Sequence, residues 1–304
     1  MNFLASYIMQ GRMQAAMVAS VLAMLSFILP PLSIFSAAAV ALVSLRKGQS
    51  EGILIVAVAV IAVGVLSQIL FEAFVFAVGY ALGFWLPVWL ISIVLRETGR
   101  LSVAFEIILA LGFIAIGMVY LFSDDPAVFW QQRLQMIIQP MLDDPASGIE
   151  PDKLKQGLSV ASHYMTGILV TGTVSTLILS LLVGRWWQAN LYNPGGFRKE
   201  FLSVKPRPLV AYVCLGVFLT AIIADGLLGE VMQNMSVLAF FLYLVVGTAV
   251  LHVLVSATKL KRLLLPAFYV TVMLVPHAML PVALVGFTDT WQNWRRRVAV
   301  VENG

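Results

Sequence analysis

The feature that most constrains this chain is a series of long apolar blocks separated by short clusters of charged residues. Most blocks contain the roughly 20 residues with which an α-helix crosses the hydrocarbon core of a bilayer. The pattern therefore predicts an all-α, polytopic transmembrane helix bundle. The blocks comprise residues 13–29, 32–45, 53–71, 74–95, 101–122, 158–183, 208–228, 231–257 and 263–287.

Composition supports the same reading. Hydrophobic residues make up 61% of the 304 residues and charged residues only 11%, whereas a soluble domain carries about 25% charged residues. A large soluble core would instead show apolar stripes at helical period between charged faces. We expect a single transmembrane domain, residues 1–304, in a bacterial inner membrane with lipids around it.

Motifs for common chemistry are missing from the sequence. It contains no P-loop, Rossmann glycine fingerprint, HExxH or G-x-S-x-G. Its one cysteine, Cys214, lies inside an apolar block, and no Cys/His cluster has metal-ligand spacing. We expect no metal, no cofactor, no nucleic-acid partner and no enzymatic activity.

Prolines leave the number of crossings open at both ends of the chain. Pro30-Pro31 separates the first two blocks, which form either two short spans or one long kinked span. Pro276 and Pro281 interrupt the last block. We expect one final span there, and the alternative is two short arms. Eight to ten hydrophobic segments follow.

The distribution of Lys and Arg orients the segments. Placing Arg12 and the loops at residues 46–47, 96–100, 184–207 and 259–262 in the cytoplasm puts 13 of the 19 Lys and Arg residues there. This agrees with the positive-inside rule. Residues 123–156 then form an outer loop. A single final span would place the tail, residues 288–304, outside as well, whereas two short arms would return it to the cytoplasm.

The outer loop has a helical pattern of its own. Asp124-Asp125-Pro126 is typical of a helix start, with a carboxylate cap and proline in the first turn. Asp143-Asp144-Pro145 should end this helix, and Glu150-Pro151-Asp152 should open the next. The spacing predicts an amphipathic helix on the membrane surface or over the mouth of the bundle. Its apolar face comprises Trp130, Leu134, Ile137, Ile138 and Met141.

Ionisable residues inside apolar blocks are costly in lipid and tend to mark function. Glu106, Asp225 and His252 are accordingly the candidates for a ligand pocket. Each has a plainer alternative. Glu106 would reach back to the loop arginines, Asp225 would be solvated in its loop, and His252 would hydrogen-bond a neighbouring helix.

Two features predict contact with a protein partner, in the membrane or in the cytoplasm. Small residues every four positions in the first block allow close helix approach, for a partner or for internal packing. A basic, tryptophan-rich loop follows the sixth block, where either a membrane-surface anchor or a docking element fits. The residues are Ala15, Ala19 and Ala23 in the first block, and Arg185, Trp186, Trp187, Asn193, Pro194, Gly195, Gly196, Phe197, Arg198 and Phe201 in the loop.

These features together resemble the YybS-like family of bacterial multi-pass membrane proteins, a domain of unknown function. The resemblance rests on Pro30-Pro31 with the following Arg46-Lys47-Gly48, on the Trp186 to Phe201 loop, and on residues 286–291 followed by Arg295. That family is distantly similar to the substrate-binding S components of energy-coupling-factor transporters. In those proteins a small-residue stripe on the first helix docks the coupling subunit. S components usually have about six spans, fewer than this chain, and no vitamin-pocket motif is present.

The leading hypothesis is a ligand-binding, transport-related membrane subunit that relies on a partner for energy. The alternative is a non-transporting scaffold or assembly factor of an envelope machine. An intramembrane enzyme acting on lipid is a third class, and it would need His163, His252 and His277, or several carboxylates, to converge.

Overall fold

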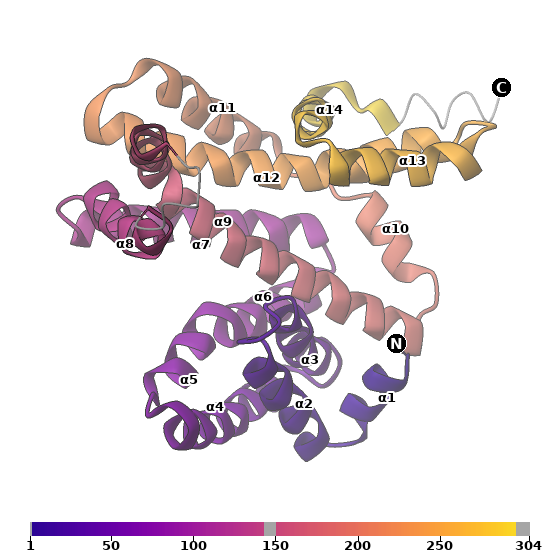
Figure 1. Ribbon diagram of the computed structural model, residues 1–304. Helices are drawn as coiled ribbons and strands as arrows, with labels where there is room; N and C mark the ends of the chain where they lie inside the picture. The colour runs from indigo at the N-terminus through magenta and orange to yellow at the C-terminus, as the bar shows by residue number, and fades with distance from the viewer. Residues whose placement is uncertain (1, 143–149, 296–304) are drawn as a thin grey trace.

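The computed structural model describes residues 2–142 and 150–295, and these residues form helices and no strands (Figure 1). Within them, five helical segments are long and apolar enough to cross a membrane. This confirms the prediction of an all-α, multi-pass membrane protein. The five are α4 (Gln49–Phe71), α5–η1–α6 (Val75–Thr98), α7 (Leu101–Phe122), α9 (Pro151–Tyr192) and α12 (Gly226–Ser256).

The remaining helices are shorter. They are α1 (Asn2–Gln10), α2 (Arg12–Leu25), α3 (Leu32–Lys47), α8 (Pro126–Leu142), α10 (Gly196–Leu202), α11 (Pro208–Ile223), α13 (Lys261–Leu274), the 3-10 turn η3 (Pro276–Ala278) and α14 (Met279–Gln292). The second crossing segment is itself composite, with α5 (Val75–Tyr80), the π-helical turn η1 (Ala81–Trp85) and α6 (Leu86–Thr98). Pro87 lacks the N–H that would bond to the carbonyl of Gly83, so the regular ladder is interrupted at this turn.

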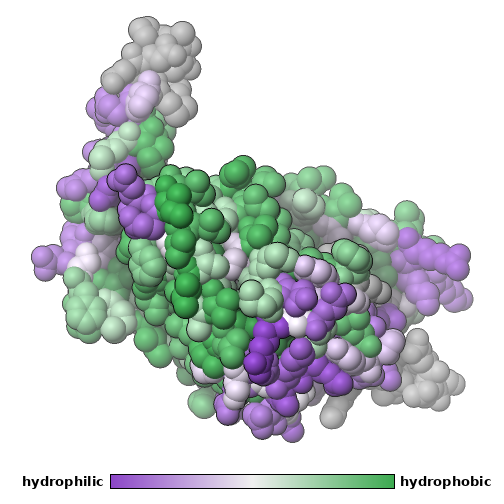
Figure 2. Space-filling model, turned by 90° about the horizontal axis from the view of Figure 1, so that it is seen from below, coloured by the Kyte–Doolittle hydropathy of each residue, from purple (hydrophilic) through white to green (hydrophobic). Residues whose placement is uncertain are grey.

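Helix α9 is the axis of the molecule. It contains 42 residues and is therefore about 63 Å long, twice the thickness of a bilayer core. In Figure 1, α1–α6 lie on one side of α7 and α9, and α11–α14 lie on the other. Figure 2 shows a broad hydrophobic surface, with hydrophilic residues gathered in clusters at its margins. A lipid-facing belt of this kind suits a membrane-embedded bundle.

The first two apolar blocks form a helical hairpin of two short arms, α2 and α3, joined at Pro30-Pro31. At one end, Arg12 Nε donates to Glu51 Oε2 over 2.8 Å at the start of α4. At the other end, the ring of Phe27 lies 5.5 Å from that of Phe71, the last residue of α4. The hairpin thus extends along the length of α4, and the single-span alternative is excluded.

The last apolar block, for which we expected a single final crossing, is not one straight span but a bent pair of helices. The segments Lys261–Leu274 and Pro276–Gln292 meet at an angle of 113°. Pro276 forces the preceding Val275 into an extended conformation, which ends α13. Beyond α14, Arg295 donates to the carbonyls of Leu202 and Val204 over 2.5 and 2.7 Å. The chain therefore returns to the loop at residues 184–207.

The basic loops gather at one end of the bundle, which we call the basic face (residues 46–48, 96–100 and 193–207). Arg96 Nη1 lies 3.4 Å from the carbonyl oxygen of Leu45, and Gln188 Nε2 donates to the same oxygen over 3.3 Å. The guanidinium of Arg46 lies over the ring of Tyr192. Since α14 also ends here, the start of the tail shares this face.

Helix α8 lies at the opposite end and packs against α9. The backbone N–H of Val128 donates to Asp125 Oδ1 over 3.0 Å, which confirms the predicted cap. Trp130, Leu134 and Ile138 are half-buried, whereas Ile137 is 71% exposed. The helical face turned to the protein is therefore narrower than predicted. The next helix begins at Pro151 as predicted, and Asp143-Asp144-Pro145 lies outside the described residues.

Candidate functional site

Four polar side chains from α7, α9 and α12 meet at the end of the bundle that carries α8, and His163 is the exposed one among them. The hydroxyl of Tyr120 donates to Glu230 Oε1 over 2.7 Å, and His163 Nδ1 lies 2.9 Å from Glu230 Oε2. Asn234, one turn further along α12, is completely buried. Its Nδ2 group lies 2.9 Å from the hydroxyl of Tyr120. We call Tyr120, His163, Glu230 and Asn234 the polar cluster.

Asn234 ties α12 directly to the backbone of α9. Its Nδ2 donates to the carbonyl of His163 over 2.7 Å, and its Oδ1 accepts from the N–H of Gly167 over 2.5 Å. This approach needs glycine at position 167, because a Cβ there would lie 2.6 Å from the carbonyl oxygen of Asn234 and 2.8 Å from its Cα. Side chain and backbone therefore hold the cluster in one geometry.

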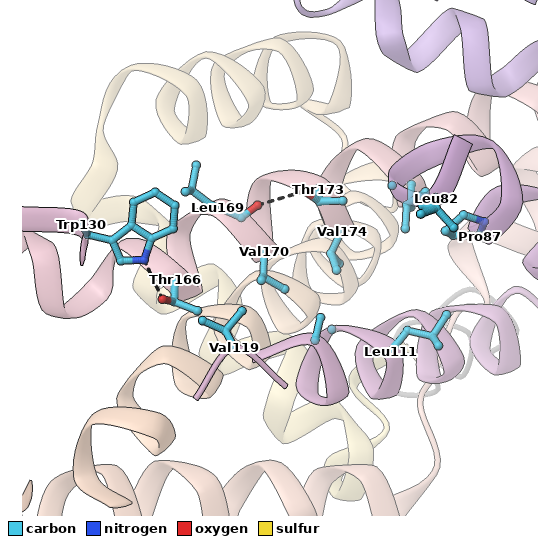
Figure 3. A pocket seen from close by; sticks show the side chains of 14 residues that line it. Leu82, Pro87, Leu111, Val119, Trp130, Thr166, Leu169, Val170, Thr173 and Val174 are labelled. Atoms are coloured by element: carbon cyan, nitrogen blue, oxygen red, sulfur yellow. Dashed lines mark hydrogen bonds between the residues drawn. The ribbon is translucent and has the colours of Figure 1, made fainter. Parts of the chain in front are cut away.

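A groove of about 390 Å³ begins beside this cluster (Figure 3). Its walls are almost wholly apolar. Figure 3 shows Trp130 of α8 at one end and Leu82 with Pro87 at the other. The indole Nε1 of Trp130 donates to Thr166 Oγ1 over 2.9 Å. The lining residues are Leu82, Gly83, Pro87, Leu111, Gly112, Ala115, Val119, Trp130, Thr166, Leu169, Val170, Thr173, Val174 and Leu177.

The groove and the polar cluster are contiguous along two helices. Thr166 precedes Gly167 on α9, and Val119 precedes Tyr120 on α7. Thr173, further along the groove, uses its hydroxyl for the carbonyl of Leu169 within the same helix. The groove is therefore polar only at the α8 end. Such a site suits a ligand with a long apolar part and one polar group.

The predicted pocket residues lie in three separate places. Glu106 is buried and accepts from the backbone N–H of Arg207 over 2.7 Å and from its Nε over 2.6 Å. This corresponds to the alternative in which Glu106 reaches back to the loop arginines. Asp225 is exposed just before α12, at the same end of the bundle as the polar cluster but outside it. His252 bonds to the hydroxyl of Tyr269 over 2.8 Å, between α12 and α13.

The three histidines are likewise dispersed. His163 belongs to the polar cluster, His252 contacts Tyr269, and His277 is exposed in the turn between α13 and α14. Across residues 2–142 and 150–295, no group of three or more His, Cys, Asp or Glu side chains is placed to hold a metal ion.

The alanine stripe of the first block is not an open surface. Ala15, Ala19 and Ala23 are fully buried within this chain. The hydroxyl of Ser36 on α3 donates to the carbonyl of Ala19 over 2.7 Å, and it accepts from Trp85 Nε1 over 3.1 Å. The close approach that small residues allow is thus made between α2 and α3. The prediction that these alanines dock a partner is corrected to internal packing.

The tryptophan-rich loop divides into a packed part and an exposed part. Trp187 is completely buried, and Trp186 is half-buried. Arg185 pairs with Glu200 of α10, its Nε donating to Oε2 over 2.8 Å. These residues are held inside the chain and present little surface to a partner.

The exposed part of the loop is its turn. Asn193, Pro194, Gly195 and Arg198 are exposed, and Gly195 has a positive φ of 85° that favours glycine. Gly196 is half-buried. The half-buried rings of Phe197 and Phe201 stack with centroids 6.0 Å apart on α10.

Comparisons with protein-family models, with curated proteins and with solved structures gave no match. Sequence reasoning passed over Tyr120, Thr166 and Asn234, which carry no charge and lie in apolar blocks. The signal that could have found the site was Asn234, an asparagine inside an apolar block, because an amide in lipid needs hydrogen-bond partners.

Proposed function

We propose that this multi-pass membrane protein binds an amphipathic, lipid-like ligand in the groove between η1–α6, α7 and α9. The observation that carries the proposal is the polarity of the groove, which is apolar along its walls and polar only beside Trp130 and Thr166. The apolar part of the ligand would lie along Leu111, Val170 and Val174. Its polar group would lie next to the polar cluster.

The geometry suits recognition more than chemistry. Glu230 already accepts from Tyr120 and contacts His163. The amide of Asn234 is engaged by the backbone of α9, by the hydroxyl of Tyr120 and by the carbonyl of Glu230. Preorganised groups of this kind orient a ligand at little cost in entropy. This favours a binding or transport role over catalysis.

The wider setting belongs to the same proposal. The protein would reside in a bacterial inner membrane, with the basic face in the cytoplasm. A partner would supply the energy for transport, in keeping with the resemblance to the YybS-like family and to S components. The exposed turn at residues 193–195 and Arg198 is the part of the loop that such a partner would contact.

The test is photo-labelling of the purified protein with a phospholipid that carries a photoactivatable group in its acyl chain. Gly83→Phe places a ring in the groove, where a Cβ meets open space. Gly117→Phe is the matched control, because Gly117 also has open space around it and lies outside the groove. Ala115→Phe fills the groove from α7 and does not alter the π-helical turn.

Labelled peptides from α7 and α9 are expected in the wild type and in Gly117→Phe, with a several-fold loss in both groove variants. Equal labelling of all four proteins would contradict ligand binding in the groove. The scaffold alternative would then be favoured, and it predicts that partner recruitment depends on Arg198 and Lys199.

A further inference from the structure

A second cavity, of about 290 Å³, lies at the basic face and shares no lining residue with the groove. Two stretches of the chain enclose it. Residues 99–106 comprise the link between α6 and α7 with the first turns of α7, and residues 200–207 run from the end of α10 to the start of α11. Half of its lining residues are charged. They are Gly99, Arg100, Leu101, Ser102, Val103, Glu106, Glu200, Ser203, Lys205 and Arg207.

Both carboxylates of this cavity are already neutralised. Glu106 is paired with Arg207, the two side chains lying 2.6 Å apart. Glu200 is paired with Arg185, which is not itself a lining residue of the cavity. The anions of the cavity are therefore not available to balance its other cations.

Two cations remain uncompensated. Among the described residues, the side chain of Arg100 has no hydrogen-bond or ion-pair partner. Lys205 Nζ donates to the amide oxygen of Asn293, which is a neutral group that positions the ammonium without balancing its charge. The cavity thus carries an excess of two positive charges, with Lys205 half-buried and Arg100 exposed at its rim.

The hydroxyl of Ser102 adds a further donor. Its oxygen accepts from the backbone N–H of Lys205 over 2.8 Å, which fixes the oxygen and leaves its proton free to point into the cavity. A guanidinium, an ammonium and a hydroxyl at the edge of one small recess match the oxygens of a phosphate group.

We propose that this cavity is a phosphate-binding site, at the end of the bundle opposite the lipid-like ligand. The phosphate belongs either to the headgroup of an anionic phospholipid or to a small soluble phosphate ester. Lys205 contacts Asn293, and Arg295 contacts the carbonyls of Leu202 and Val204. Occupation of the cavity would therefore also strengthen the attachment of α14 to the bundle.

The experiment uses the full chain in a neutral detergent. Native mass spectrometry counts bound phosphatidylglycerol against phosphatidylcholine, and calorimetry measures binding of glycerol 3-phosphate. The variants are Arg100→Gln and Lys205→Gln. Lys199→Gln is the control, because Lys199 is exposed on neighbouring α10 and does not line the cavity.

Arg100→Gln should weaken binding of the phosphate-bearing probe about tenfold or more, and Lys199→Gln should leave it unchanged. Arg100 holds no other group in place, so its variant remains informative even where Lys205→Gln disturbs the contact with Asn293. A loss confined to phosphatidylglycerol identifies a lipid headgroup, and a loss confined to glycerol 3-phosphate identifies a soluble ester. Both support the site.

The proposal is overturned when Arg100→Gln and Lys205→Gln bind both probes as well as the wild type, or when Lys199→Gln loses as much. It does not depend on the ligand groove. Gly83→Phe and Ala115→Phe should leave phosphate binding intact, so the two proposals fail separately.

Discussion

Replacing Gly167 by alanine tests the contact that holds the polar cluster together. The new methyl group would lie 2.6 Å from the carbonyl oxygen and 2.8 Å from the Cα of Asn234, and both are backbone atoms of α12. Ordinary contact requires α9 and α12 to separate by roughly 0.7 Å. Separation also stretches the two hydrogen bonds between Asn234 and the backbone of α9.

The size of the effect follows from three opposing contributions. Overpacking of a well-filled contact costs about 1–3 kcal/mol, and each interhelical hydrogen bond in a membrane protein contributes about 0.6 kcal/mol. Alanine is favoured over glycine in a helix by up to about 1 kcal/mol. We therefore expect Gly167→Ala to lower the free energy of unfolding by about 2 kcal/mol, against the sign of its helix propensity.

The matched control is Gly172→Ala, on the same helix, where a Cβ meets open space. This variant should be as stable as the wild type or up to about 1 kcal/mol more stable. The assay is unfolding in mixed micelles by titration with sodium dodecyl sulfate, followed by far-ultraviolet circular dichroism. Equal stability of the two alanine variants would refute the argument that α9 and α12 are in backbone contact at Gly167.

Three further predictions concern the basic face. Arg295→Ala should destabilise the protein by about 3 kcal/mol in the same assay, because Asp289 is buried and its carboxylate would lose the only ion pair that the structure gives it. An effect below 1 kcal/mol would contradict this pairing. Arg207→Ala should cost about 1–3 kcal/mol, since it removes the partner of a buried carboxylate but is itself largely exposed. For topology, Gln292→Cys should react with a membrane-impermeant maleimide from the side of the basic face, and Asp124→Cys from the opposite side; the native cysteine is buried and gives no background. Labelling of both from one side would contradict the return of α14.

Much of the helical architecture was predictable because it depends on neighbours along the chain. The block at residues 101–122 coincides with α7, and the cap at Asp125 and the start at Pro151 were read from local residue types. Membrane insertion requires length and apolarity, and capping requires a carboxylate next to a helix start. Both are local properties that a sequence displays directly.

The candidate sites depended on contacts that no local pattern encodes. Glu106 meets Arg207 across 101 residues, and Tyr120 meets Glu230 across 110. The alanines of α2 became internal packing, and proline turned a single apolar block into a returning pair. In a bilayer the outside of a helix is as apolar as its inside, so hydrophobicity does not say which face is buried or which helices become neighbours. The sequence alone determined that this chain is a helical membrane protein with a basic end. Only the packing of α9 against α7 and α12 decided where its polar groups converge.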